Sequence, residues 1–167
     1  MKKIWGAALL GSMLLLAGCG GNQHTKETKE NVQQSADEKE AMKVYQDVHK
    51  KYDEKMNKEL NQSVQLWGQA KEKGGKSIAN KQFKEDVQKV TKSMLEDIEH
   101  IRTEIRVPKS KEQEHKLYEG FLNETEQAMK KLDQLAKEED SSLIRDIEVH
   151  FSTASTYYKR FQKEAQN

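Results

Sequence analysis

Several acidic and histidine side chains have a spacing that could hold a metal ion. The pairs lie three or four residues apart, on one face of a helix: Asp97 with His100, Glu112 with His115, and Asp146 with His150. A buried site needs these residues on the apolar face. Glu112, however, precedes Leu117 by five positions, roughly 140° around a helix, and Asp97 and His100 flank their apolar stripe. We therefore expect solvated pairs and predict no metal site.

The segment AKEKGGKS, residues 70–77, matches a loosened phosphate-loop pattern. That loop wraps phosphates with backbone N–H groups between a strand and a helix. Here a helical pattern that ends at Trp67 precedes the segment, and Ala70 occupies the place of the first glycine. We interpret Gly74 and Gly75 as a turn and predict no nucleotide binding and no cofactor.

Nucleophilic catalysis finds no support in the residue pattern. The histidines are scattered along the chain, at His24, His49, His100, His115 and His150. No Gly-x-Ser-x-Gly elbow accompanies them, and Cys19 is the single cysteine. A nucleophile beside a base is therefore not indicated, and we expect a protein that is not an enzyme.

The first nineteen residues carry the most specific signal. Lys2 and Lys3 form a basic start, and Ile4 to Leu16 is an apolar run of thirteen residues. A signal-peptide core has roughly 7–15 apolar residues, whereas a membrane-spanning helix needs about 20. The run ends in Leu16-Ala17-Gly18-Cys19, which resembles the lipobox of a bacterial lipoprotein signal peptide.

This resemblance implies a location. In lipoproteins of this class a diacylglycerol is joined to the cysteine sulfur by a thioether, and a peptidase cuts before the cysteine, here between Gly18 and Cys19. Two acyl chains suffice for stable anchoring. The expected place is the extracytoplasmic face of the cell membrane, and lysine-rich composition favours a Gram-positive source. The alternatives are an uncleaved apolar N-terminus or an ordinary secretory signal with a chance cysteine.

Composition limits the remaining possibilities. Charged residues make up 34% of the chain, and losing Lys2 and Lys3 with the signal takes the formal charge from +1 to −1. Such a balance provides no field to collect nucleic acid. A single cysteine excludes an intramolecular disulfide, and one proline favours an all-α chain.

Residues 20–36 contain almost no large apolar side chain, so we expect a flexible tether. A helical period begins at Ala41 and continues to the turn at Gly74-Gly75. Its apolar stripe is Ala41, Tyr45, Val48, Tyr52, Met56, Leu60, Val64 and Trp67.

Three further amphipathic helices follow. The second begins near Ser77 or Asn80 and ends before Pro108, with the stripe Phe83, Val87, Val90, Met94, Ile98, Ile101 and Ile105. The third, with Ser110 and Gln113 as a capping box, has the stripe Leu117, Phe121, Thr125, Ala128, Leu132 and Leu135. The fourth, capped within 140–142, has the stripe Ile144, Ile147, Phe151, Ala154, Tyr158, Phe161 and Ala165.

Four such helices with short turns predict an antiparallel up-down-up-down bundle. The alternative is a three-helix bundle with a projecting first helix. We divide the chain into a signal peptide at 1–18, a lipidated cysteine and tether at 19–37, and a bundle at 38–167.

Aromatic residues supply the best pointers to a binding surface. Tyr118 and Leu122 lie one position off the third stripe, where they either widen the core or form an exposed strip. Tyr157 lies beside the fourth stripe. Tyr157 and Tyr158, with Phe161 and Tyr45, could line a groove for a peptide or glycan, although the stripe positions of Tyr158 and Phe161 favour the core. We take Tyr118, Leu122 and Tyr157 as the possible partner surface.

These observations favour a non-catalytic, membrane-tethered helical module whose partner is a membrane or envelope protein. A cell-wall binder that uses aromatic and basic side chains is the alternative. A helical metal-binding domain is the third hypothesis. A bundle in which the acid–histidine pairs point to water would exclude the third.

The lipobox assignment makes a direct prediction for Cys19→Ala. Without the thiol the chain cannot form the thioether, so the precursor should stay unlipidated and uncleaved by the lipoprotein peptidase. Metabolic lipid labelling and the mass of the precursor measure both effects. Lipid labelling equal to that of the wild type would refute the assignment.

Overall fold

A computed structural model of the chain describes residues 24–166, with side chains from residue 35 onward except 73 and 74. The signal peptide and lipobox lie outside these residues. The chain divides into two units, Met1–Gln34 and Ser35–Asn167. The elements are α1 (His24–Lys71), a 3₁₀ turn at Glu72–Gly75, α2 (Lys81–Glu104), a second 3₁₀ turn at Lys109–Lys111, α3 (Glu112–Glu138) and α4 (Leu143–Glu164).

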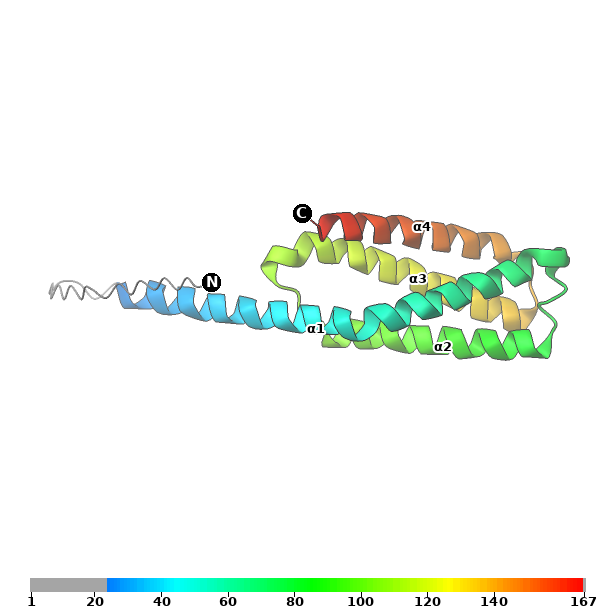
Figure 1. Cartoon of the computed structure of the whole chain (residues 1–167), viewed down its shortest axis with the longest axis horizontal. Helices are drawn as coiled ribbons and strands as arrows, with labels where there is room; N and C mark the ends of the chain where they lie inside the picture. The colour runs from blue at the N-terminus through cyan, green and yellow to red at the C-terminus, as the bar shows by residue number, and fades with distance from the viewer. Residues whose placement is uncertain (1–23, 167) are drawn as a thin grey trace, which may run out of the picture. The chain divides into compact units, whose positions relative to one another are not determined.

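Within the unit that begins at Ser35, the four helices form the expected antiparallel bundle. Successive helices run in opposite directions, joined by short connections (Figure 1). The alternative of a three-helix bundle with a projecting first helix is wrong, because α1 contributes Tyr45, Val48, Tyr52 and Met56 to the buried core. None of the described helices combines the length and apolarity needed to cross a bilayer.

The apolar stripes of α2 and α3 are buried as predicted. On α2 every stripe residue from Phe83 to Ile101 is buried, and Ile105 is half-buried. On α3 the whole stripe from Leu117 to Leu135 is buried, including the polar Thr125. Each of these two helices has one largely apolar face and one charged face, so the hydrophobic effect fixes its orientation in the bundle.

The second half of α1 faces the core with different residues from those predicted. The structure buries Glu59, Ser63, Leu66 and Ala70, whereas Val64 is 39% exposed. Ser63 lies inside because its hydroxyl donates to the backbone carbonyl of Glu59 at 2.8 Å and contacts Met129 Sδ at 3.3 Å. Burial of these polar side chains therefore shifts the buried face by one position relative to the predicted stripe.

The helix caps agree with prediction at α2 and differ at α3. Asn80 Oδ1 accepts from the backbone N–H groups of Gln82 and Phe83, as an N-cap does. Ser110, in contrast, does not cap α3; its hydroxyl donates to Glu38 Oε1 at 2.9 Å. Glu38 also accepts the backbone N–H groups of Lys109 and Ser110, and these bonds lower its pKa.

The predicted coil at 20–36 is replaced by helix from His24 onward, where α1 begins. Residues 24–36 contain neither glycine nor proline and are rich in Lys, Glu and Gln, which are good helix formers. A helix already nucleated by the packed part of α1 extends through such residues at little cost, because propagation is easier than nucleation.

The α3–α4 interface contains one very close approach. A Cβ added at Gly120 would lie 2.5 Å from Cδ1 and Cε1 of Tyr157. Glycine is otherwise unfavourable within a helix by about 1 kcal/mol relative to alanine. Gly120 is thus explained by the Tyr157 ring that lies on it.

We predict that Gly120→Ala destabilises the bundle by about 1–3 kcal/mol through overpacking, despite the better helix propensity of alanine. In a Tyr157→Ala background the same change should stabilise by about 0.5–1 kcal/mol. Gly68→Ala is the matched control, because a Cβ at Gly68 meets nothing within 4 Å. Urea unfolding of the four variants measures these effects, and a stabilising Gly120→Ala in the wild-type background would contradict the contact.

Candidate functional site: a groove between α1 and α4

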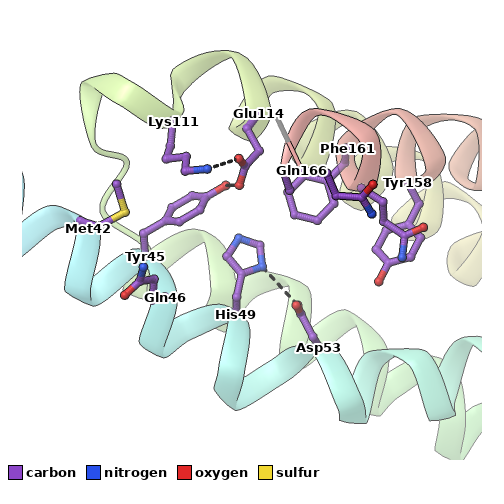
Figure 2. Close-up of a pocket in the computed structure, with 12 residues that line it drawn as sticks. Met42, Tyr45, Gln46, His49, Asp53, Lys111, Glu114, Tyr158, Phe161 and Gln166 are labelled. Carbon is purple, nitrogen blue, oxygen red and sulfur yellow. Dashed lines mark hydrogen bonds and ion pairs between the residues drawn. The ribbon is translucent and has the colours of Figure 1, made fainter.

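A groove lies between α1 and the end of α4, with the start of α3 at its closed side (Figure 2). Rings and a methionine form its apolar part, and amides and charged groups form its edges. Its lining residues are Met42, Tyr45, Gln46, His49, Asp53, Lys111, Glu114, Tyr158, Phe161, Gln162, Ala165 and Gln166.

One end of the groove holds a neutralised carboxylate. Tyr45 Oη donates to Glu114 Oε1 at 3.2 Å, and Lys111 Nζ donates to Glu114 Oε2 at 2.5 Å. Burial raises the pKa of the Tyr45 phenol, and the neighbouring Glu114 charge raises it further. Tyr45 therefore stays a hydrogen-bond donor, and Lys111 balances the buried Glu114 charge.

A second carboxylate, Asp53, has no such cation. His49 Nδ1 lies 3.2 Å from Asp53 Oδ1, and Tyr118 Oη donates to the same oxygen at 3.4 Å. Among the described residues no lysine or arginine nitrogen lies within 4.0 Å of it, and His49 is its sole ion-pair partner there. Asp53 is partly exposed to the groove, with 38% of its side chain accessible.

Aromatic rings surround the His49–Asp53 pair. The His49 ring stacks on Phe161 with centroids 5.5 Å apart and planes 17° apart, and its centroid lies 4.5 Å from that of Tyr118. Tyr158 packs on Phe121 at 4.9 Å. His49 Nε2 is buried without a hydrogen-bond partner. The groove thus has aromatic rings beside one carboxylate, Asp53, whose ion-pair partner among the described residues is a histidine.

His115 lies behind this groove. Its Nε2 is 3.5 Å from Glu119, whereas its Nδ1 is buried without a partner. Burial lowers the pKa of His115, and the Glu119 charge opposes that effect. The histidine is therefore part of the packed bundle interior next to the groove.

The predicted partner surface is wrong at two of its three residues. Tyr118 and Leu122 are 1% and 0% exposed, so they widen the core and form no exposed strip. Tyr157 is half-buried over Gly120. Because α3 packs against α2 and α4, its apolar face must be wider than one stripe. The sequence contains a signal for this wider face, because two pairs of adjacent apolar residues, 117–118 and 121–122, occur one turn apart, and all four are buried.

The groove itself was predicted only in part. Of the four residues that the sequence offers for a groove, Tyr45, Tyr158 and Phe161 line it. Tyr157 does not, because its ring lies over Gly120. His49, Asp53 and Glu114 also line the groove and were not among those four. A spacing of four residues along α1, from Tyr45 to His49 to Asp53, places them on one face and was the signal that could have found two of them.

The three acid–histidine pairs form no shared metal site. Within the described part of the chain, no three His, Cys, Asp or Glu residues are placed to hold a metal ion. Asp146 pairs with Lys131 at 3.1 Å, and His150 Nδ1 contacts Glu124 at 2.8 Å on α3. Glu112 and His100 are exposed.

The prediction of a solvated Asp97 is wrong, since only 4% of this residue is exposed. Lys55 of α1 explains this burial, since its Nζ donates to Asp97 Oδ1 at 2.7 Å. The lysine thus bridges α1 and α2.

The glycine segment near residue 75 is a turn, as interpreted. Glu72–Gly75 is a 3₁₀ turn after a helix, and Gly75 has φ of 83°, which favours glycine. The Ser77 hydroxyl donates to the backbone carbonyl of Gln69 at 2.6 Å and so closes the turn.

Comparison with protein-family models, curated proteins and solved structures found no match to this chain. The geometry of the groove and the N-terminal sequence are therefore the basis for a functional assignment.

Beside Asp97, the α1–α2 interface buries a second carboxylate, Glu59. Ser93 Oγ donates to Glu59 Oε1 at 2.5 Å, and Lys55 Nζ lies 3.7 Å from that oxygen. Glu59 Oε2 and Asp97 Oδ2 are buried without partners. Burial raises the pKa of Glu59; the Ser93 hydrogen bond opposes this rise, and the Asp97 charge adds to it.

A carboxyl whose pKa is raised by folding binds its proton more tightly in the folded state than in the unfolded state. The free energy of unfolding therefore falls as the pH rises from 4.5, the ordinary pKa of a glutamate, through the pKa of Glu59 in the folded protein. We predict that Glu59→Gln removes this fall and stabilises the protein by about 1 kcal/mol at pH 7. Unfolding measured between pH 4.5 and 7.5 tests it. Glu99→Gln, an exposed change of the same charge, should parallel the wild type; a Glu59→Gln curve parallel to both would contradict the prediction.

Proposed function

We propose that this chain is a lipid-anchored protein of the extracytoplasmic membrane face whose bundle binds a protein partner through the α1–α4 groove. The Leu16-Ala17-Gly18-Cys19 sequence supports the anchor. The groove, with rings at its base and polar side chains at its edges, supports the binding role. Such a combination of apolar base and polar rim is typical of protein interfaces.

The position of the groove between two helices suits an elongated peptide segment. Parallel or antiparallel insertion of an amphipathic helix into such a groove is a common recognition mode. Gln46, Gln162 and Gln166 are exposed at the edges, where their amides can bond to the backbone or side chains of a bound segment. We assign no reaction to this site.

The cell-wall alternative is less well supported. Glycan recognition uses aromatic rings whose faces are open to solvent, yet every aromatic residue in the described part of the chain is buried or half-buried. The Trp67 Nε1–H donates a hydrogen bond to the backbone carbonyl of Ile144. The Lys71 ammonium lies 4.1 Å from the centroid of the Trp67 ring. The groove therefore favours a protein partner.

Anchoring would favour a partner in the same membrane. A diacylglycerol on Cys19 confines the bundle near the bilayer, and confinement raises the effective concentration of the groove for membrane-bound partners without any additional contact. Weak groove binding would then suffice for function.

Site-specific photo-crosslinking tests this proposal in the cells that make the protein. A photoreactive phenylalanine analogue replaces Gln162 at the groove edge or, as the control, Gln127 on α3; both residues are exposed helical glutamines. We expect a discrete protein adduct from position 162, and none of that mass from position 127. The adduct should weaken when Cys19→Ala is combined with the probe.

Equal adducts from both positions, or none from position 162, would contradict binding through the groove. An adduct that is unaffected by Cys19→Ala would support the groove and contradict the role of the anchor.

A further inference from the structure

We infer that the groove binds a primary alkylammonium group, presented as a lysine side chain by the partner protein. The source of the lysine rests on the proposed function, whereas the chemistry of the site rests on the groove itself. Asp53, the rings around it and the amides at the groove edge carry this inference.

Charge in the groove selects a cation. Two carboxylates line it, and Lys111 pairs with Glu114 at 2.5 Å. Asp53 is left with a histidine contact at 3.2 Å and no lysine or arginine partner among the described residues. A half-buried carboxylate in this state is stabilised by an arriving cation, because the surrounding apolar rings weaken solvent screening.

The rings beside Asp53 form an apolar surface. Phe161 and Tyr158 line the groove with centroids 6.0 Å apart, and Tyr118 lies behind them, 5.0 Å from Phe161. Figure 2 shows these rings from α4 facing the His49–Asp53 pair of α1. The methylene groups of a lysine would pack on the same rings.

The free acceptors favour a primary ammonium over other cations. Asp53 Oδ1 is engaged by both His49 and Tyr118. Arginine pairs best with both oxygens of a carboxylate, whereas lysine makes a single contact. A primary ammonium also has further N–H groups for the amide oxygens of Gln46 and Gln162 at the groove edges, which a quaternary ammonium lacks.

An NMR titration tests the inference on the full chain, purified in maltoside micelles. The probe is Nα-acetyl-lysine methylamide, and we expect saturable shifts of groove resonances with a millimolar Kd, centred on Asp53, Tyr158 and Phe161. The norleucine analogue, which has the same methylenes without the ammonium, should bind at least about fivefold more weakly, and so should the trimethyl-lysine and arginine analogues.

Two variants assign the effect to the groove. Asp53→Asn keeps the shape and an acceptor for Tyr118, and should weaken lysine binding about fivefold while leaving norleucine binding unchanged. Glu54→Gln, the adjacent exposed acid, is the matched control and should bind like the wild type. Tyr158→Leu removes one ring and provides an independent loss of affinity.

Equal binding of the lysine and norleucine probes, or no saturable shifts at all, would overturn the inference. An equal loss in Glu54→Gln and Asp53→Asn would reduce the effect to general charge attraction and overturn it as well. Lysine binding without a crosslink from position 162 would contradict the proposed protein partner and leave the ammonium site in place. A crosslink without lysine binding would contradict the ammonium site and leave the proposed partner in place.

Discussion

The contact between the His49 ring of α1 and the Phe161 ring of α4 is the interaction on which the groove depends. Helices approach as closely as the side chains between them allow. Against α3, α4 lies on a glycine, with the Tyr157 ring seated directly over Gly120. Against α1, the same helix must accommodate the stacked rings of His49 and Phe161. Both of these ring residues line the groove.

Polar side chains of α1 also contact all three neighbouring helices. Its buried face carries Glu59 toward α2, Tyr45 toward Glu114 of α3, and the His49–Asp53 pair toward α4. Buried polar groups are stable only when their partners are present, and His49 Nε2 has none in the described structure. The end of α1 that borders the groove therefore holds both the Tyr45 contact to the ion-paired Glu114 and a half-exposed carboxylate, Asp53. In our proposal, Asp53 is the group that a partner's cation would contact. A binding site that is already formed loses little entropy when it is filled.

Sequence patterns predicted the parts of the bundle that apolar burial decides. The α2 and α3 stripes, from Phe83 and from Leu117, are buried because one face of each helix is largely apolar. The second half of α1 was misplaced because Glu59 and Ser63 lie inside, and a hydrophobic pattern cannot detect polar residues that find partners on other helices. Tyr118 was misjudged for a related reason, since α3 is covered on more than one side. The groove depends on contacts between residues more than 60 positions apart, such as Tyr45 with Glu114, and no local pattern encodes them.

The open aromatic end of the α1–α4 interface is the central structural claim, and ring contacts measured in solution test it most directly. A nuclear Overhauser spectrum of the protein with labelled aromatic side chains should show cross-peaks from the His49 ring to both Phe161 and Tyr118, whose ring centroids lie 5.5 and 4.5 Å away. It should show none from Tyr45 to Tyr158, which line the groove from α1 and α4. Cross-peaks between Tyr45 and Tyr158, with loss of the His49–Phe161 contact, would mean that α1 and α4 close on each other and that no groove exists.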